Sequence, residues 1–353
     1  MTLSPVFRSP EAVEALRSRG YLRSLRPSIK AQRECVGRLS ELLLDVISPD
    51  YIADRRQPEE DVDFLQENFF LVLFHSLFRT LGVPDERLRA YALLNLCIKG
   101  LVTSGDNLFD GEAKMALPLR LGKGKRFASI MQMLSFEHLI DRILEEHAPF
   151  FSAQQKVLFR RSLLTRMAAI GTLEGSEEAG VQSVPEVDAM IDRVHRVRGG
   201  QLFALAFVAP SIAESGVEPS KWRAAERGVS HLGTAFQIVD DVTDFEFDLG
   251  RGSHNIVVAQ IVHHGSAEER AALEQVRAKG AAPPAGTLEQ YFSGPAAEIL
   301  DIARKEAEEG FAIWKGLGFW FPPEDAALFV RAIAGDNGDQ RVRQVSEGLL
   351  GVF

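Results

Sequence analysis

Hydrophobic positions recur at intervals of three and four residues along most of the chain, and this spacing predicts helices rather than strands. No stretch shows the strict alternation of apolar and polar residues that a half-buried strand would have. Proline and glycine interrupt the pattern between the segments, as helix ends require. The helical segments cover residues 62–82, 86–103, 126–147, 153–173, 187–208, 220–249, 255–264, 267–279, 288–317 and 324–334. The pattern therefore predicts an all-α fold, a single large bundle of about ten or more helices.

The segment from Phe64 to Leu81 is apolar on nearly every side. A helix of this kind lies in the centre of a large bundle, and a long bundle can enclose an apolar cavity. Helical patterning continues on both sides of the Pro-rich and Gly-rich stretch 280–286, so we expect a surface loop there and not a domain boundary. We predict one domain over 1–353, in which residues 1–60 form an N-terminal helical extension.

Composition narrows the possible partners. The 353 residues include 46% hydrophobic ones and carry a net charge of −9, which argues against nucleic acid and favours a small-molecule partner. Cys35 and Cys97 lack the spacing of a metal site or a disulfide framework, and this fits a reducing cytoplasm. The apolar runs are shorter than the roughly 20 residues of a membrane span. The first thirty residues lack the apolar centre of a signal peptide. We therefore expect a cytoplasmic protein without a transmembrane segment.

Three aspartates, Asp240, Asp244 and Asp248, follow one another at i, i+4 and i+8. On a continuous helix they share one face, where each pair of like charges destabilises the helix by roughly 0.2 to 0.5 kcal/mol. A bound cation would offset this repulsion, and hard carboxylate oxygens suit Mg²⁺. The spacing predicts a magnesium site.

A second acidic pair, Asp106 and Asp110, follows a strongly apolar segment at the same i, i+4 spacing. Between the two acidic groups, Arg193, Arg196 and Arg198 precede the pair Gly199-Gly200. Arginine forks match phosphate oxygens, and the glycines would bend the helix and expose backbone carbonyls. Together these groups indicate binding and ionisation of a diphosphate.

These residues resemble the trans-polyprenyl diphosphate synthases and, more broadly, the class I isoprenoid synthases. The segment from Phe236 to Asp244 (FQIVDDVTD) matches that family's second aspartate-rich motif almost letter for letter. The segment from Asp106 to Asp110 (DNLFD) resembles the first motif with its second Asp replaced by Asn. Arg198-Gly199 stands where the family carries Lys-Thr. The resemblance covers roughly residues 63–255.

The chain departs from the family where isopentenyl diphosphate, the second substrate, would bind. Gln66-Glu67-Asn68 stands in place of a Gly-Lys-Arg motif, Lys99 in place of a histidine, and Lys114-Met115-Ala116 in place of an Arg-Arg pair. Glu67 would repel a diphosphate. These departures favour a terpene synthase or cyclase, which ionises one prenyl diphosphate without isopentenyl diphosphate. Arg196 ahead of the glycine pair is similar to the arginine sensor of such cyclases.

The resemblance implies an isoprenoid synthase fold, a prenyl diphosphate substrate, Mg²⁺ as cofactor and a homodimer. The metal ligands and catalytic carboxylates that it implies are Asp106, Asp110, Asp240, Asp244 and, as a metal ligand only, Asp248. The substrate contacts are Arg196, Arg198, Gly199, Gln237 and Arg251, and Arg198 also neutralises the leaving group.

Two alternatives stay open at this point. One is a chain-elongating polyprenyl diphosphate synthase with a remodelled second-substrate site, for which the candidate cations are Lys99, Lys114, Arg120 and the group Lys123, Lys125 and Arg126. The other is a non-catalytic subunit that binds a prenyl diphosphate.

Overall fold

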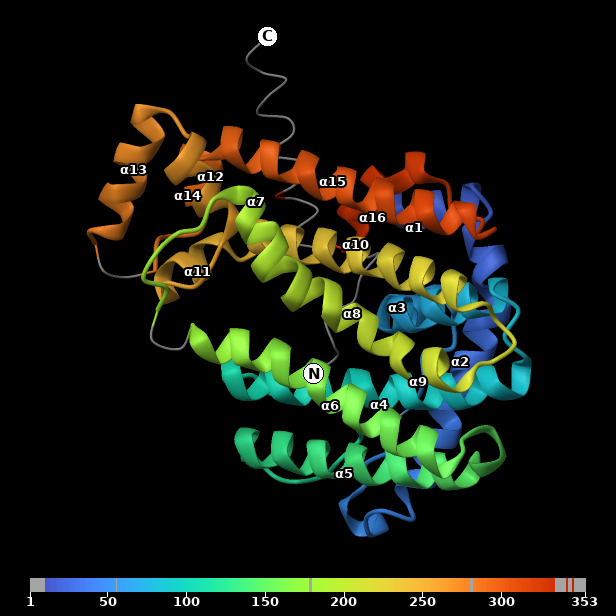
Figure 1. Ribbon diagram of the computed structural model, residues 1–353. Coiled ribbons are helices and arrows are strands. Elements are labelled where there is room, and N and C mark those ends of the chain that lie inside the picture. Colours follow the sequence, from blue (N-terminus) through green and yellow to red (C-terminus); the bar gives the residue numbers. More distant parts are fainter. Residues whose placement is uncertain are drawn as a thin grey trace. The chain divides into compact units, whose positions relative to one another are not determined.

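The computed structural model describes residues 10–54, 56–177, 180–279 and 282–333, together with residues 341 and 345. Helices and connecting loops make up these residues, apart from an isolated antiparallel bridge between Ile52 and Leu119 (Figure 1). The predicted all-α fold is confirmed. None of the helices in the described ranges is long and apolar enough to cross a bilayer.

The chain divides into two compact units. The first contains residues 13–162 and 205–222, and the second contains residues 163–204 and 223 onward. The expectation of one domain over 1–353 concerns how these units sit together, and it stays a prediction.

The helices of the first unit are α2 (Tyr21–Leu43), α3 (Asp61–Thr80), α4 (Asp85–Asp110), α5 (Lys125–Glu146) and α9 (Val208–Ala213), with short 3₁₀ turns at η1 (Pro49–Tyr51), η2 (Ala148–Phe150) and η4 (Leu205–Phe207). The helices of the second unit are α7 (Val187–Met190), α8 (Leu202–Ala204), α11 (Phe245–Arg251), α12 (Ile256–His264), α13 (Ala267–Arg277), α14 (Thr287–Tyr291), α15 (Ser293–Gly316) and α16 (Ala326–Ile333), with the 3₁₀ turn η5 (Pro323–Asp325). Helices α1 (Pro10–Ser18), α6 (Ala153–Ser176) and α10 (Pro219–Thr243) each contribute residues to both units.

Helix α3 forms the centre of the first unit, as its all-round apolar sequence predicts. Phe64, Leu77 and Phe78 are at most 1% exposed. Helix α2 packs against α3, α4 and α5 through a buried face, so the predicted N-terminal extension contributes to this core. Helices α4 and α5 run side by side and touch closely at Gly100, where a Cβ atom would lie 2.0 Å from the ring of Phe136. Close packing therefore fixes the helix whose end carries Asp106 and Asp110.

Helices α10 and α15 meet at small residues in the second unit. The indole of Trp314 donates a hydrogen bond to the carbonyl of Ala225 at 3.0 Å, over Gly228. A Cβ atom at Gly228 would lie 2.3 Å from the indole nitrogen, so only glycine permits this approach. Helix α15 is also packed against α12 and α16. The α10 backbone is thereby held in place up to the aspartate-rich segment.

The sequence pattern predicts single helices over 187–208 and 220–249, and the structure divides both. Residues Ile191–Gln201 form a π-helical segment, η3, between α7 and α8. Helix α10 ends at Thr243, and Asp244 has φ −102° and ψ 14° before α11 begins. Backbone hydrogen bonds still run from Asp244 N to Asp240 O at 2.8 Å and from Asp248 N to Asp244 O at 2.9 Å. The predicted continuous aspartate face is therefore bent at its middle residue.

Candidate active site

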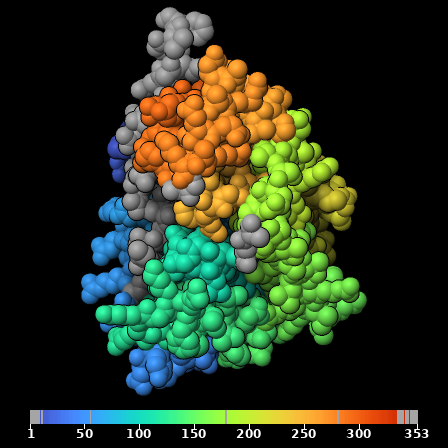
Figure 2. All heavy atoms as spheres, turned by 90° about the vertical axis from the view of Figure 1, so that its left-hand side faces the viewer, coloured from blue at the N-terminus to red at the C-terminus, as the bar shows by residue number. Residues whose placement is uncertain are grey.

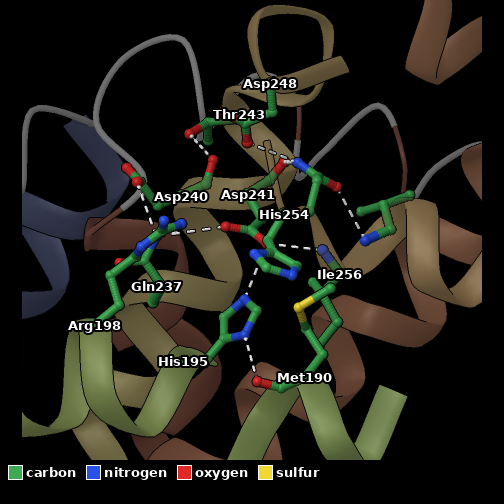
Figure 3. A network of polar contacts seen from close by, with 12 residues as sticks. Met190, His195, Arg198, Gln237, Asp240, Asp241, Thr243, Asp248, His254 and Ile256 are labelled. Atoms are coloured by element: carbon green, nitrogen blue, oxygen red, sulfur yellow. Dashed lines mark hydrogen bonds and ion pairs between the residues drawn. The ribbon is translucent and has the colours of Figure 1, made fainter. Parts of the chain in front are cut away.

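Segment η3 and helix α10 cross with their backbones in direct contact. A Cβ atom at Gly199 would lie 2.1 Å from the carbonyl oxygen of Gly233, and one at Gly233 would lie 2.2 Å from that of Gly199. Both positions therefore require glycine. The crossing brings Arg198, one residue before Gly199, to the side of Gln237 and Asp240 on α10 (Figure 3). The sequence predicts a helix bend at Gly199-Gly200, but the departure from α-helical geometry begins earlier, at Ile191.

Asp240 lies close to the carboxylates of Asp241 and Asp244. Burial raises its pKa well above the usual range, and the carboxylates of Asp244 and Asp241 raise it further. The Arg198 guanidinium and a hydrogen bond from the Gln237 amide to Asp240, 3.3 Å long, offset only part of this effect. The surroundings therefore disfavour the ionised form of Asp240, and a bound cation would stabilise that form.

Asp248, on α11, is also close to the carboxylates of Asp240, Asp241 and Asp244. Burial raises its pKa to about 9, the Asp241 carboxylate adds to the rise, and a hydrogen bond from Asn255 opposes it. The Asn255 amide donates to Asp248 Oδ2 at 2.9 Å and to the carbonyl of Asp241 at 2.7 Å. Its own oxygen caps α12 by accepting from the Val257 N–H at 3.0 Å. Asn255 thus joins the end of α10, α11 and the start of α12.

Asp241 has a different role from its neighbour Asp240. It is 2% exposed, and its Oδ2 atom accepts hydrogen bonds from His195 Nε2 at 2.9 Å and from the Ile256 N–H at 2.7 Å. The other ring nitrogen of His195 lies 3.2 Å from the carbonyl of Met190. Both ring nitrogens of His195 thus face oxygen atoms, and the buried Asp241 carboxylate has two donors for one of its oxygens. This pair anchors η3 to α10 (Figure 3).

Arg198 is held by two glutamates at the end of α6 and directly after it. Its side chain is 13% exposed, Nε pairs with Glu174, and Nη2 lies 2.8 Å from Glu177 Oε1. Burial lowers the pKa of Arg198, but the carboxylates of Glu174, Glu177 and Asp241 outweigh burial and raise it. Glu177 also pairs with His254. A diphosphate would therefore compete with carboxylates for the Arg198 guanidinium.

The sequence patterns did not point to Glu174, Glu177, His195 or Asn255. Each acts through a partner distant in sequence, and no spacing rule connects such partners. The i, i+1 repeat Asp240-Asp241 was the available signal for Asp241, because adjacent helical residues point in different directions and so differ in environment.

Arg196 and Arg251 make contacts of a different kind. Arg196 pairs with Asp192 at 3.3 Å and with Glu306 on α15 at 3.2 Å. The Arg251 guanidinium lies 5.2 Å from the ring centroid of Phe247. Of the predicted substrate contacts, Arg198, Gly199 and Gln237 therefore lie together. Arg196 instead pairs with Glu306 on α15.

The first acidic pair is part of the other unit. Asp106 and Asp110 are exposed at the end of α4. The chain segment coloured teal, to which this helix end belongs, lies on the face shown in Figure 2. Asn107, at the position where the family has its second Asp, is 2% exposed. Its amide donates to the carbonyl of Lys114 at 2.8 Å and its oxygen accepts from the Lys114 N–H at 3.0 Å. Asn107 thus clamps the loop after α4 by two hydrogen bonds. An aspartate could accept from the Lys114 N–H but could not donate to the Lys114 carbonyl.

A small cavity in the first unit occupies the region where the family resemblance places the second substrate. It has a volume of about 100 Å³ and is lined by Gln57, Glu67, Asn68, Leu96, Lys99 and Phe136, among others. Helix α3 is kinked there, because Asn68 has φ −129° and ψ 20°. The Lys99 ammonium donates to the carbonyl of Glu67 at 2.8 Å. The cavity thus contains one cation and one carboxylate at a helix kink.

The oxygen donors of the aspartate-rich segment fit Mg²⁺. The raised pKa values of Asp240 and Asp248 mean that the protein alone disfavours their ionised forms, which a bound cation would stabilise. Within the described ranges, no three His, Cys, Asp or Glu side chains converge closely enough to hold an ion by themselves. Mg²⁺ commonly keeps several waters and takes further ligands from substrate phosphates.

Comparisons of the whole chain find similarity in structure and none in sequence. No protein-family model matches the chain, and no curated protein matches it. A decaprenyl diphosphate synthase from Rhodobacter capsulatus matches over 92% of this chain and 99% of its own, at 17% identity and a TM-score of 0.57. An octaprenyl pyrophosphate synthase from Helicobacter pylori matches over 86% of this chain and 99% of its own, at 12% identity and a TM-score of 0.56. A geranylgeranyl pyrophosphate synthetase from Pyrococcus horikoshii gives 16% identity and a TM-score of 0.51 over 88% and 99% of the two chains.

The chain has the isoprenoid synthase fold. The fold that the aspartate motifs imply is confirmed. The three similar structures are prenyl diphosphate synthases, whereas the sequence favoured a terpene cyclase. The departures at Glu67 and Met115 had suggested the cyclase, but loss of a few family residues does not identify a new reaction. Which of the predicted side chains act on substrate stays a prediction.

Proposed function

We propose that this protein, which has the isoprenoid synthase fold, catalyses Mg²⁺-dependent chain elongation of a prenyl diphosphate. In this reaction the C1–O bond of an allylic diphosphate breaks and diphosphate leaves. The terminal double-bond carbon, C4, of isopentenyl diphosphate then bonds to C1, which leaves a tertiary cation at C3. Loss of a proton from C2 then forms the new C2–C3 double bond. The observation that carries the proposal is the group of carboxylates around Asp240, whose ionised form is disfavoured and which lies beside Arg198, in a fold similar to polyprenyl synthases.

The proposed metal ligands are Asp240, Asp244 and Asp248 of the second unit and Asp106 and Asp110 of the first. Bound Mg²⁺ would supply the positive charge that stabilises the leaving diphosphate. Arg198 and Gln237 would hold diphosphate oxygens, and the pair of Asp241 and His195 would keep η3 and α10 in register while charge develops.

The second substrate needs cations outside the aspartate-rich segment. Lys99 is the candidate that lines the cavity of the first unit, and a diphosphate there would take over its ammonium from the Glu67 carbonyl. Lys114 is a further candidate. Burial lowers its pKa, but Glu112, Asp106 and Asp110 outweigh burial and raise it, so it stays cationic beside the first acidic pair.

A terpene cyclase is the second candidate function. Glu67 favours it, because a carboxylate in a cavity of about 100 Å³ opposes a second diphosphate. A non-catalytic binding subunit would need neither a Mg²⁺ site nor an arginine that stabilises a leaving diphosphate.

The deciding experiment incubates the purified protein with Mg²⁺ and geranyl, farnesyl or geranylgeranyl diphosphate, each with and without isopentenyl diphosphate. Elongated prenyl diphosphates that appear only with both substrates would support the proposal. Diphosphate release from the allylic substrate alone, with a hydrocarbon or alcohol product, would replace it with the cyclase. No release in any mixture would favour the binding subunit.

A homodimer and a cytoplasmic location also belong to this proposal. Phe127, Ile130 and Leu134 are 47 to 55% exposed on α5 at i, i+3 and i+7, which is the apolar stripe that a partner helix would cover. Light scattering after size-exclusion chromatography would test it, since Ile130→Lys should convert a dimer to a monomer. Cys35 and Cys97 are both buried and unpaired, which supports a reducing compartment.

A further inference from the structure

One arginine outside every sequence motif binds the end of α10. The Nη1 atom of Arg341 donates to the carbonyl of Val242 at 3.1 Å and to that of Thr243 at 2.8 Å. Its Nη2 atom lies 2.9 Å from Glu246 of α11, and its Nε atom lies 2.8 Å from Glu289 of α14. The side chain is 12% exposed. All three nitrogens of the guanidinium are thus engaged, on three different helices.

These contacts occur where α10 would otherwise leave carbonyls unpaired. The last carbonyls of a helix lack partners within it, and a cation there also meets the negative end of the helix dipole. Asn255 covers the carbonyl of Asp241, and Arg341 covers the next two. Three consecutive carbonyls between Asp240 and Asp244 therefore receive side-chain donors.

The carboxylates that hold Arg341 extend this connection. Glu246 accepts from the Leu288 N–H at 3.1 Å as well as from Arg341. Glu246 belongs to α11 and Leu288 to α14, so one partly buried ion-pair group links both helices to the end of α10. Asp244, the residue at the bend, lies between the carbonyls and Glu246 in the chain.

We propose that Arg341 is a positioning residue that fixes the bend between α10 and α11. This bend sets the relation of Asp240, on α10, to Asp244 and Asp248, on and after the bend. Mg²⁺ demands near-ideal octahedral geometry, so a change in the bend would weaken its binding. The inference rests on the proposed function, because it assumes that these aspartates bind Mg²⁺.

The test measures metal binding directly and not turnover. Titration calorimetry of Mg²⁺ into wild-type protein with excess inorganic pyrophosphate would give the half-saturating Mg²⁺ concentration. Loss of a residue that orients metal ligands typically weakens metal binding by about 10- to 100-fold. We expect a shift at the lower end of that range for Arg341→Met. Arg341→Lys should give a smaller shift, because lysine keeps the charge but cannot bridge three partners.

The matched control is Arg166→Met. Arg166 also joins a carbonyl, that of Ala204, and a glutamate, Glu226, in the second unit, but away from the aspartates. We expect Arg166→Met to lower the melting temperature without changing the half-saturating Mg²⁺ concentration. If Arg341→Met does not fold, Glu289→Gln removes a partner of Arg341 and should shift Mg²⁺ binding in the same direction.

Two results would contradict different claims. Unchanged Mg²⁺ binding in Arg341→Met and Glu289→Gln, with a loss of melting temperature like that of Arg166→Met, would overturn the positioning role. Failure of the wild-type protein to bind Mg²⁺ with pyrophosphate would overturn the metal site of the proposed function.

Discussion

The aspartates at the end of α4 and those around the end of α10 have the same i, i+4 spacing, yet their environments differ. Asp106 and Asp110 are exposed, and the residue between them that is buried, Asn107, is uncharged. In the other segment Asp241 is buried and paired with His195, and Asp240 and Asp248 have strongly raised pKa values. Identical spacing therefore does not mean identical electrostatics.

The difference shows where each segment depends on its surroundings. The α10 segment needs support from η3, α6, α11 and α12, because partly buried carboxylates repel one another unless donors hold them apart. The α4 segment needs only a helix and a clamped loop. Substitutions should therefore distinguish charged side chains that act on the substrate from charged side chains that maintain the structure.

The largest effect is expected for Asp240→Asn. This change removes a proposed metal ligand and keeps the shape of the side chain. We expect activity to fall about 10²- to 10³-fold, the usual loss when one stabilising group at a reacting centre is removed. Initial-rate assays of diphosphate release would measure it.

The metal-free Asp240→Asn protein should also melt at a higher temperature, because one of several repelling charges is gone. The control is Asp301→Asn, an aspartate 45% exposed on α15 whose ion pairs lie on the helix surface. Equal activity of the two variants would remove Asp240 from the proposed site.

The next effect distinguishes Arg198 from Arg196. Arg198→Met should lower kcat/KM by about 100-fold, in the range expected for an ionic group that stabilises the reacting charge. Arg196→Met should change it far less, because Arg196 pairs with Asp192 and Glu306. A steady-state comparison of the two variants decides, and a larger loss for Arg196 would restore the sensor role that the sequence suggested.

The fold and the charged motifs were accessible from the sequence because both depend on local spacing. Apolar periodicity predicted the helices, including α3, whose Phe64 and Leu77 are buried. The bend at Asp244 was missed, since no proline or glycine marks it, and its contacts come from Asn255 and Arg341. The π-helical turns of η3 were missed because the Gly199 crossing and the contact of His195 with Asp241 are tertiary.

A smaller effect is expected when the missing acid of the first motif is restored by Asn107→Asp. The carboxylate would lose the bond to the Lys114 carbonyl and place a charge at a site that is 2% exposed. A buried group left without its partner costs about 1 to 3 kcal/mol of stability. Urea unfolding would detect this loss.

Asp106→Asn provides the opposite exchange one residue earlier on the same helix. Asp106 is exposed, so stability should hold while activity falls. If Asn107→Asp were instead stable and more active, Asn107 would be a weakened metal ligand and not a loop clamp.

The smallest effect concerns Glu306, which holds Arg196 and also accepts from His231 at 2.7 Å. Burial raises the pKa of Glu306, but the His231 hydrogen bond and the Arg196 charge outweigh burial and lower it. A lowered folded-state pKa adds stability above the unfolded value of about 4.3, and this stability is lost as the pH falls through the folded value.

Glu306→Gln should therefore lose about 0.5 to 1.5 kcal/mol of stability at pH 7. Its difference from wild type should shrink below pH 4.3, as urea unfolding across that range would measure. Glu309→Gln, exposed on the same helix, is the control. A difference from wild type that is constant with pH would mean that Glu306 contributes packing and not charge, and that Arg196 is free to serve another partner.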